Sequence, residues 1–257
     1  MAISPYQNKQ QSEWKSITEE LITNYPLSTD EILEISLIAW EKLWGTEVGG
    51  TIKLVEVDLP ATVIGYFFQK LFSYELSKRY PNEWKGEKEK SDKDLVNIKN
   101  PTFSTEMKAS GQLGYKIFGN RSYNQQGFNE ETTGKDKSGF YITINFYSQT
   151  LTLISIGWID QNDWNSQDSE TGQAATLKPE VYTHKLVQIN GKYQLKSPIS
   201  LLNGIGKVSC EKLYKENIFT FEDIINYKGN DKVVINIYNK NKSLLETIKE
   251  CSLSVTL

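Results

Sequence analysis

The sequence contains few of the residues on which many enzymes depend. Its 257 residues include one histidine, His184, and two cysteines, Cys210 and Cys251. A single histidine excludes multi-histidine metal sites, and serine–histidine catalysis could run only through His184, which has no acidic pattern around it. Two cysteines cannot form a disulfide scaffold or a cysteine-rich zinc site. We expect a structural or surface role for His184, which leaves carboxylates and lysine as catalytic groups.

Long apolar runs are absent as well. No stretch approaches the ~18 apolar residues of a membrane-spanning helix, and the first fifteen residues contain no apolar core of a secretory signal. We therefore expect a cytoplasmic protein without membrane contact. The 38% hydrophobic and 12% aromatic content is typical of a globular chain, with one large domain or one domain and a small appendage.

Charge is unevenly distributed along the chain. The formal net charge is −3, but the segment from Lys178 to the end has twelve lysines against eight acidic residues, about +4, which leaves about −7 for the rest. Only two arginines occur, Arg79 and Arg121. A local excess of positive charge on an otherwise acidic chain is consistent with one surface that faces a polyanion.

One stretch combines acidic residues and a lysine at the spacing of a strand. Asp94 opens a short apolar run that ends at Ile98, and an Asn-Pro pair then marks a turn. The next run, Thr102–Lys108, alternates so that Glu106 and Lys108 share one face. If the two runs pair as a hairpin, Asp94 returns towards Glu106, and the three side chains suit a magnesium site with a charged helper. The alternative is a surface hairpin whose Glu–Lys pair contributes little to stability.

This pattern resembles the motif of the PD-(D/E)XK nucleases, in which an Asp is followed, after a spacer, by Glu-x-Lys on the next strand. The resemblance implies that Asp94, Glu106 and the carbonyl of Met107 hold Mg²⁺. It also implies that Lys108 orients the attacking water and helps to deprotonate it. Asp92 is a weaker alternative for the first acid. Two other Glu-x-Lys triplets have no preceding acid on a plausible strand: Glu13-Trp14-Lys15 and Glu83-Trp84-Lys85.

A helix is predicted before this stretch, from Pro60 to about Arg79. It contains Gly65-Tyr-Phe-Phe-Gln69, which resembles the Gly-x-x-Phe-Glu pattern of a helix in many PD-(D/E)XK nucleases. The Glu of that pattern can supply an extra ligand, often through water. Here the position is Gln69, whose amide oxygen can still accept a hydrogen bond from metal-bound water. Glu75 is a weaker substitute.

A polar, glycine-containing segment follows Lys108. We expect four of its residues to contact DNA: Asn120, Arg121, Ser122 and Tyr123. Arg121 carries the guanidinium that can make a bidentate contact with guanine or phosphate, which the ammonium group of lysine cannot. The alternative is a polar surface loop.

The segment from Ser200 to Ile225 resembles the helix-hairpin-helix motif, with Leu-x-Gly-Ile-Gly followed by a helix. Gly204 and Gly206 free backbone N–H groups at a helix N-terminus, where phosphate binds, and Lys207 adds positive charge. We expect these three residues to contact the DNA backbone. The alternative is a plain helical hairpin.

The remaining patterns predict further helices and strands. Helices are expected from Ser16 to about Tyr25 and from the capping box at Ser28 to Trp44. Strands are expected at Phe140–Tyr147 and Leu151–Ile159, and as a hairpin of Val181–Val187 and Lys192–Lys196 around Asn190-Gly191. Thr51–Val57 is predicted to be a strand or an extended connector, and Lys232–Tyr238 and Leu253–Leu257 to be edge strands or segments packed on the main domain.

These elements give an α/β (α+β) fold class, a mixed central sheet flanked by helices. Residues 1–198 are expected to form a restriction-endonuclease-like domain with N-terminal helices. Residues 199–257 are expected to form a small helix-hairpin-helix DNA-binding region.

The nuclease motif, the run Ile117–Tyr123 and the trailing hairpin together resemble type II restriction endonucleases of the PD-(D/E)XK class, MjaI-type or related. The resemblance implies Mg²⁺-dependent, sequence-specific hydrolysis of phosphodiester bonds in double-stranded DNA by a homodimer. Two alternatives stay open at this point. One is a structure-selective or repair nuclease with the same site, and the other is a non-catalytic DNA-binding protein with a helix-hairpin-helix motif.

Overall fold

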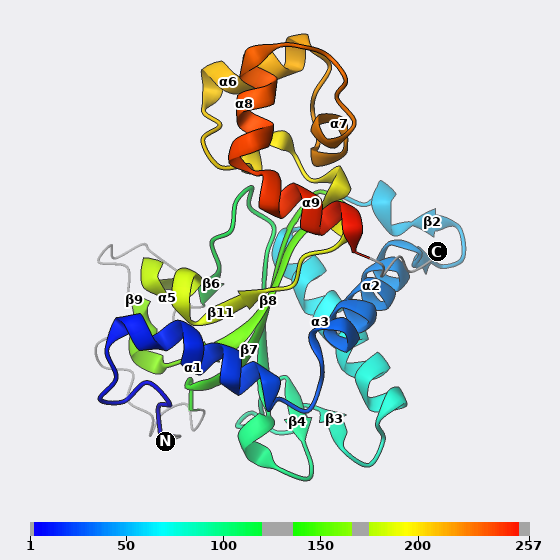
Figure 1. The fold of residues 1–257 in the computed structure, drawn as a ribbon. Coiled ribbons are helices and arrows are strands. Elements are labelled where there is room, and N and C mark those ends of the chain that lie inside the picture. Colours follow the sequence, from blue (N-terminus) through cyan, green and yellow to red (C-terminus); the bar gives the residue numbers. More distant parts are fainter. Residues whose placement is uncertain (1–2, 120–135, 166–174, 252–257) are drawn as a thin grey trace.

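The computed structural model describes residues 3–119, 136–165 and 175–251. A six-stranded sheet lies at its centre, with the strand order β11-β8-β7-β5-β4-β3 (Figure 1). β5 and β7 run parallel, and the other neighbouring strands are antiparallel. The sheet is therefore mixed and flanked by helices, as predicted. Its strands are β3 (Trp84–Gly86), β4 (Leu95–Asn97), β5 (Thr105–Ser110), β7 (Gly139–Tyr147), β8 (Thr150–Ile159) and β11 (Leu186–Gln188).

The hairpin of β7 and β8 confirms the two strands predicted there. Alternate residues of β7 point to opposite faces, so Phe140, Ile142 and Ile144 enter one hydrophobic core while Tyr141 enters another. Both faces of β7 are buried, which explains why this strand is apolar along most of its length.

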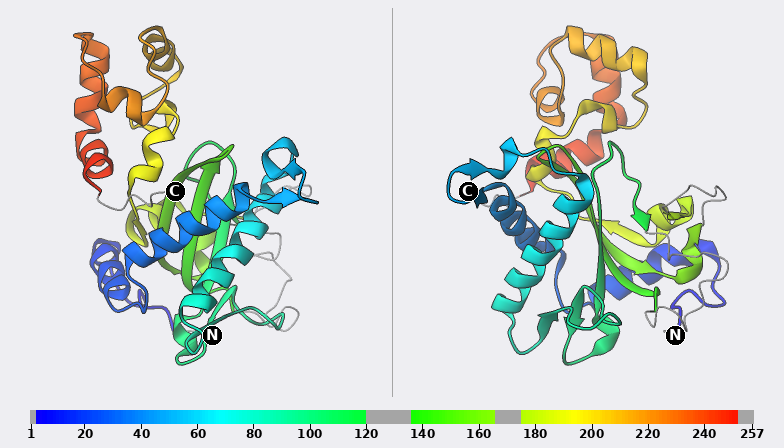
Figure 2. Two further views of the ribbon diagram at one scale, coloured as in Figure 1. Left: turned by 90° about the vertical axis from the view of Figure 1, so that its right-hand side faces the viewer. Right: turned by 180° about the vertical axis from the view of Figure 1, so that it is seen from behind.

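Two long helices cover the first face of the sheet (Figures 1 and 2). α2 (Thr29–Trp44) begins at the predicted N-cap, where Ser28 Oγ accepts a hydrogen bond from Glu31 N, and ends at Gly45. α3 (Ala61–Arg79) follows Pro60, as predicted. Between them lie a 3₁₀ turn (Leu54–Glu56) and a short hairpin of β1 (Glu47–Val48) and β2 (Ile52–Lys53), where the sequence suggested one strand or connector.

The second face carries α5 (Pro179–His184) and a small sheet in the order β6-β10-β9, whereas the apolar side chains of α1 (Gln11–Thr23) pack against the same core as α2 and α3. The strands of this small sheet are β6 (Phe118–Gly119), β9 (Trp164–Asn165) and β10 (Ala175–Leu177). α1 begins earlier than the predicted Ser16, because the carboxylate of Glu13 accepts a hydrogen bond from Gln10 N and caps the first turn.

The predicted hairpin around Asn190-Gly191 is wrong. Residues 179–184 form α5, which begins with a proline at its first position, and β11 pairs with β8 instead. Residues 192–196 form a 3₁₀ turn. The buried hydroxyl of Tyr193 donates to Ile189 O and accepts from Ile154 N, so this turn is tied to β8 through a side chain. A turn dipeptide alone does not reveal that contact.

The C-terminal part is a group of short helices beyond one end of the sheet (Figure 2). Its helices are α6 (Lys207–Lys215), α7 (Phe221–Ile225), α8 (Lys232–Lys240) and α9 (Lys242–Glu250). They enclose their own apolar cluster, which draws all its fully buried residues from 199–248. The predicted strand at Lys232–Tyr238 is wrong, because Asp231 caps α8 by accepting from two backbone N–H groups. Leu253–Leu257 lies outside the described residues.

No helix in the described part of the chain has both the length and the apolar character needed to cross a membrane.

Candidate active site

The short strand β4 places Asp94 beside β5. β4 and β5 are antiparallel, as predicted, with Leu95 opposite Thr105. One residue further along this register, Asp94 lies opposite Glu106, and cross-strand neighbours of this kind are in side-chain contact range. The predicted strand at Thr102 begins later, at Thr105, because Pro101–Phe103 forms a 3₁₀ turn.

The backbone of Met107 connects the three predicted catalytic side chains. Asp94 Oδ2 accepts a hydrogen bond of 2.7 Å from Met107 N, and Lys108 Nζ donates one of 3.1 Å to Met107 O. Lys108 Nζ also lies 3.7 Å from Glu106 Oε2. The N–H and C=O of one strand residue point to the same edge, so Asp94 and Lys108 meet the peptide groups of Met107 on the edge of β5 away from β7.

These charged groups lie within the folded chain rather than on its surface. Glu106 is 1% exposed and Asp94 7% exposed, and the Lys108 side chain is 19% exposed. The interpretation as a solvated surface pair is therefore wrong for Glu106 and Lys108. Burying carboxylates costs free energy unless cations and hydrogen-bond donors compensate their charge, and here Met107 N donates to Asp94 and the ammonium group of Lys108 lies near Glu106.

Helix α3 approaches β5 closely because of one glycine. A Cβ atom on Gly65 would lie 2.7 Å from the Cβ of Ala109, a distance that side chains do not tolerate. This contact brings the first turns of α3 beside the strand. Gln69 lies one helical turn after Gly65 and lines the same pocket as Lys108. Glu75 instead forms an ion pair of 2.5 Å with Lys42 of α2.

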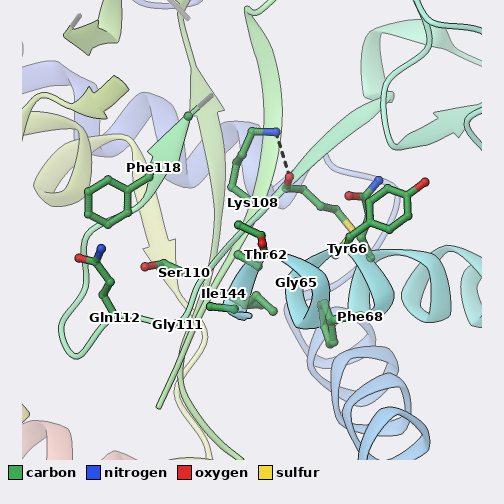
Figure 3. Close-up of a pocket in the computed structure, with 15 residues that line it drawn as sticks. Thr62, Gly65, Tyr66, Phe68, Lys108, Ser110, Gly111, Gln112, Phe118 and Ile144 are labelled. Atoms are coloured by element: carbon green, nitrogen blue, oxygen red, sulfur yellow. Dashed lines mark hydrogen bonds between the residues drawn. The ribbon is translucent and has the colours of Figure 1, made fainter. Parts of the chain in front are cut away.

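A pocket of about 680 Å³ opens between α3, β5 and the segment that follows β5 (Figure 3). Lys108 lies at its β5 wall. Sequence reasoning missed several of its residues: Thr62, Tyr66, Gln112 and Phe118. Helical spacing could have found the first two, because they lie seven and three residues before Gln69 and share its face. Gln112 and Phe118 follow β5 without a periodic signal.

The other acidic candidates have different partners. Asp92 Oδ2 accepts hydrogen bonds from the backbone N–H groups of Lys88 and Glu89, which closes an exposed turn. Of the other Glu-x-Lys triplets, one lies in α1 and the other at the start of β3, at the sheet's outer edge. In the β3 triplet, Glu83 forms an exposed ion pair of 2.6 Å with Lys99.

The predicted DNA contacts fall in two places. Residues 120–123 lie outside the described residues. Gly204, Gly206 and Lys207 are exposed in the hairpin before α6, and the positive φ of +81° at Gly204 favours glycine there. The segment before this hairpin is a 3₁₀ turn, Ile199–Leu201, where the motif would have a helix.

The side chain of Asn241, at the junction of α8 and α9, holds this hairpin. Its Oδ1 accepts from Asn203 N at 2.9 Å, and its Nδ2 donates to Asn203 O at 3.2 Å and to Ile237 O at 2.9 Å. Asn241 is 4% exposed. Sequence reasoning did not identify this residue, because its partner lies 38 residues earlier in the chain.

The donor atoms at the β4–β5 edge suit a small, hard cation. Within the described ranges, no three side chains of His, Cys, Asp or Glu form a group that could hold a metal. The available donors are therefore two carboxylates and the carbonyl of Met107. All are oxygen atoms, the ligand type that Mg²⁺ prefers, and Mg²⁺ commonly binds through one or two carboxylates and completes its shell with water and substrate phosphate.

Buried acidic groups beside a lysine, where β4 meets β5 in a mixed sheet and next to a pocket, are features that a metal-dependent nuclease needs. Comparison with known proteins gives the class as the type II restriction endonucleases. A family model described as ScaI restriction endonuclease matches residues 4–190. The type II restriction enzyme ScaI of Streptomyces caespitosus is 30% identical over 196 residues, which cover 73% of this chain and 85% of that enzyme. No solved structure matches the chain.

The chain belongs to the ScaI restriction endonuclease family. It is therefore a type II restriction endonuclease, which binds double-stranded DNA and cleaves it internally. This membership favours restriction over the repair-nuclease and non-catalytic alternatives that the sequence left open.

Proposed function

We propose that this endonuclease uses a PD-(D/E)XK centre made of Asp94, Glu106 and Lys108, in a restriction-endonuclease-like fold, and that it requires Mg²⁺. One observation carries the proposal. Leu95 pairs with Thr105, a register that supports a position of Asp94 near Glu106 when it is extended by one residue, and both Asp94 and Lys108 bond to the peptide groups of Met107. Residues that are up to fourteen positions apart in the chain thus converge on one strand edge beside a pocket.

Asp94, Glu106 and the carbonyl of Met107 would hold Mg²⁺. When bound, the metal would stabilise the charge that develops on the phosphate oxygens. Asp94 also fixes the strand edge, because its hydrogen bond to Met107 N sets the direction in which the neighbouring carbonyl points. Gln69 lines the same pocket and has an amide oxygen that can accept a hydrogen bond from a water molecule.

Lys108 orients the attacking water and helps to remove its proton as the water attacks phosphorus in line. Its ammonium group is positioned by Met107 O at 3.1 Å and by Glu106 Oε2 at 3.7 Å. The same positive charge offsets the two buried carboxylates before substrate binds. It also favours the approach of a phosphate group to the pocket.

DNA contacts outside the centre are proposed for two segments. Asn120, Arg121, Ser122 and Tyr123 are proposed to contact the target, with Arg121 suited to a bidentate contact. Gly204, Gly206 and Lys207 are proposed to bind backbone phosphate as a helix-hairpin-helix element, which the exposure of the hairpin and its own apolar core support.

The proposed domain division is 1–198 for the nuclease and 199–257 for the DNA-binding region. The family match to residues 4–190 and the separate apolar cluster in 199–248 support this division. We further propose a homodimer for a palindromic site and a cytoplasmic location. A closer relation to MjaI-type enzymes stays a prediction.

The test is cleavage of plasmid or phage DNA by the purified protein with and without Mg²⁺. We expect discrete bands with Mg²⁺ and intact DNA with EDTA. The Lys108→Ala variant should not cleave, whereas Lys85→Ala should cleave at the wild-type rate, because Lys85 belongs to the Glu-x-Lys triplet of β3. Full cleavage by a folded Lys108→Ala variant would disprove the assignment.

A further inference from the structure

Helix α3 carries two exposed tyrosines, Tyr66 and Tyr74, which differ in whether they line the pocket beside β5. Tyr66 is 58% exposed and Tyr74 61% exposed, whereas of the three phenylalanines between them Phe68 and Phe72 are buried and Phe67 is partly buried. Only Tyr66 of these two tyrosines lines the pocket that contains Lys108. A tyrosine offers an apolar ring and a hydroxyl on a stiff side chain, which suits contact with a ligand that is part apolar and part polar.

The ring of Tyr66 is held in place on the outer side of α3. The ammonium group of Lys70, one turn later, lies 4.9 Å from the centre of the ring. Lys70 in turn forms an ion pair of 2.5 Å with Glu87, which follows β3. A side chain that is already oriented loses less conformational entropy when it binds. The side chain of Tyr66 is therefore preorganised for binding, although more than half of it is exposed to solvent.

We propose that Tyr66 is a substrate-contacting residue that binds the sugar–phosphate backbone of the strand being cut, at a phosphate next to the scissile one. This inference rests on the proposed active centre at Lys108. Figure 3 shows Tyr66 on the α3 side of the pocket, with its hydroxyl pointing away from Lys108. A phosphate beside Lys108 would leave the hydroxyl near a neighbouring nucleotide of the same strand.

The chemistry of Tyr66 matches a DNA backbone. Its hydroxyl can donate to a phosphate oxygen, and tyrosine is among the side chains that make such contacts. Its ring can cover the apolar face of a deoxyribose. A contact of this kind reads no base, so it should strengthen catalysis at the target without changing which sequence is cut. Its purpose would be to fix the scissile phosphate against the catalytic groups.

The first experiment measures kcat and KM for a duplex that contains the target site. Loss of one hydrogen bond to a charged group corresponds to a drop in kcat/KM of about tenfold for Tyr66→Phe. Loss of the ring as well should lower kcat/KM by about 100-fold for Tyr66→Ala. The matched control, Tyr74→Ala, should stay within about twofold of wild type, because surface changes away from a site have small effects.

The second experiment identifies the phosphate. Single neutral methylphosphonate groups replace each phosphate around the cut in turn, and wild type is compared with Tyr66→Phe on each duplex. At one phosphate beside the scissile position, the tenfold difference should disappear, because the acceptor for the hydroxyl has lost its charge. A purely structural role for Tyr66 would give the same difference on every duplex.

The outcomes separate this inference from the proposed centre. If Lys108→Ala is inactive but Tyr66→Ala cleaves like Tyr74→Ala, the inference is wrong and the centre stands. If Lys108→Ala cleaves normally, the centre itself is wrong. A Tyr66→Phe defect that no single neutral phosphate removes also overturns the backbone contact, and a change in the sequence that is cut would assign Tyr66 to base recognition instead.

Discussion

The β4–β5 edge and the hairpin at Gly204–Lys207 use charge in opposite surroundings. Glu106 is 1% exposed, and its cationic neighbour Lys108 is only partly exposed. The residues of the hairpin face water, except Ile205, which packs against the apolar cluster of the C-terminal helices. A buried charged group is held firmly and is costly to disturb, whereas an exposed lysine interacts weakly with its surroundings until a polyanion arrives.

The comparison indicates a division of labour. Groups that act on a bond need fixed geometry and a low dielectric, which the burial of Asp94 and Glu106 beside the central sheet supplies. Groups that bind a phosphate backbone need only accessible N–H groups and positive charge. Changes at the first place should therefore remove chemistry and spare binding, and changes at the second should weaken binding and spare chemistry.

The clearest separation of cleavage from DNA binding is expected from Glu106→Gln. This variant keeps the shape of the side chain but removes the negative charge that we assign to the metal, so cleavage should fall by at least about 1,000-fold. DNA binding should stay near wild type, and a melting curve checks that the variant is folded. A cleavage assay and a binding assay in the absence of Mg²⁺ measure both. Glu83→Gln, at the residue before β3, is the control, and equal loss in both variants would contradict the proposed centre.

A smaller effect is expected at the hairpin. Lys207→Ala should weaken DNA binding by about three- to tenfold at moderate salt and reduce the slope of log affinity against log salt by about one. Lys215, at the other end of α6, provides the control. Titrations at several salt concentrations give the slope. An unchanged slope for Lys207→Ala, or an equal change for Lys215→Ala, would show that the hairpin does not contact DNA as proposed.

The junction residue Asn241 tests whether the hairpin depends on a tertiary contact. Asn241→Ala removes three hydrogen bonds, two of which hold Asn203. The free energy of unfolding should fall by about 2 kcal/mol, since the hydrogen bonds of a buried amide side chain to three backbone groups are lost. Denaturant unfolding measures the loss, and cleavage by saturating enzyme should persist. Wild-type stability in this variant would show that the hairpin keeps its conformation without the hydrogen bonds of Asn241.

The smallest effect is expected where α2 and α3 are joined at the surface. Two hydrogen bonds from Arg79, at 2.8 and 2.9 Å, lower the pKa of the Glu34 carboxyl, although partial burial opposes the shift. A lowered pKa stabilises the fold above the unfolded value, and this stabilisation is lost as the pH falls through the folded value. Arg79→Gln should cost less than about 1 kcal/mol near neutral pH, because both side chains contact water.

Unfolding at pH 7 and pH 3 checks this last expectation. The difference in unfolding free energy between wild type and Arg79→Gln should shrink at the lower pH, where Glu34 becomes protonated. A difference that grows with acidity would contradict the pairing as its cause.

Local patterns predicted the parts of the molecule whose structure depends on neighbouring residues. The capping box at Ser28, the long helix after Pro60 and the strands of the β7–β8 hairpin could all be predicted, because caps and periodicity act within a few residues. The same patterns failed at Asn190-Gly191 and at Lys232–Tyr238. There a buried tyrosine hydroxyl and an aspartate cap decide the structure, and neither is part of the pattern that was used.

The candidate site divides in the same way. Alternation along β5 placed Glu106 and Lys108 on one face, and the Asn-Pro turn returned Asp94 to them. Helical spacing places Tyr66 on the same face as Gln69, but Gln112 could not be assigned to the pocket, because that requires knowing how the segment after β5 lies against the strand.

The sequence by itself determined which charged residues are available, their order along β4 and β5, and where α2 and α3 begin. Only the tertiary structure decided that Glu106 is buried, that Gly65 lets α3 contact β5 at Ala109, and that Asn241 holds a hairpin 38 residues away. The reason is physical. Hydrogen-bond periodicity is a property of adjacent residues, whereas burial and helix–sheet packing depend on which distant surfaces exclude water together.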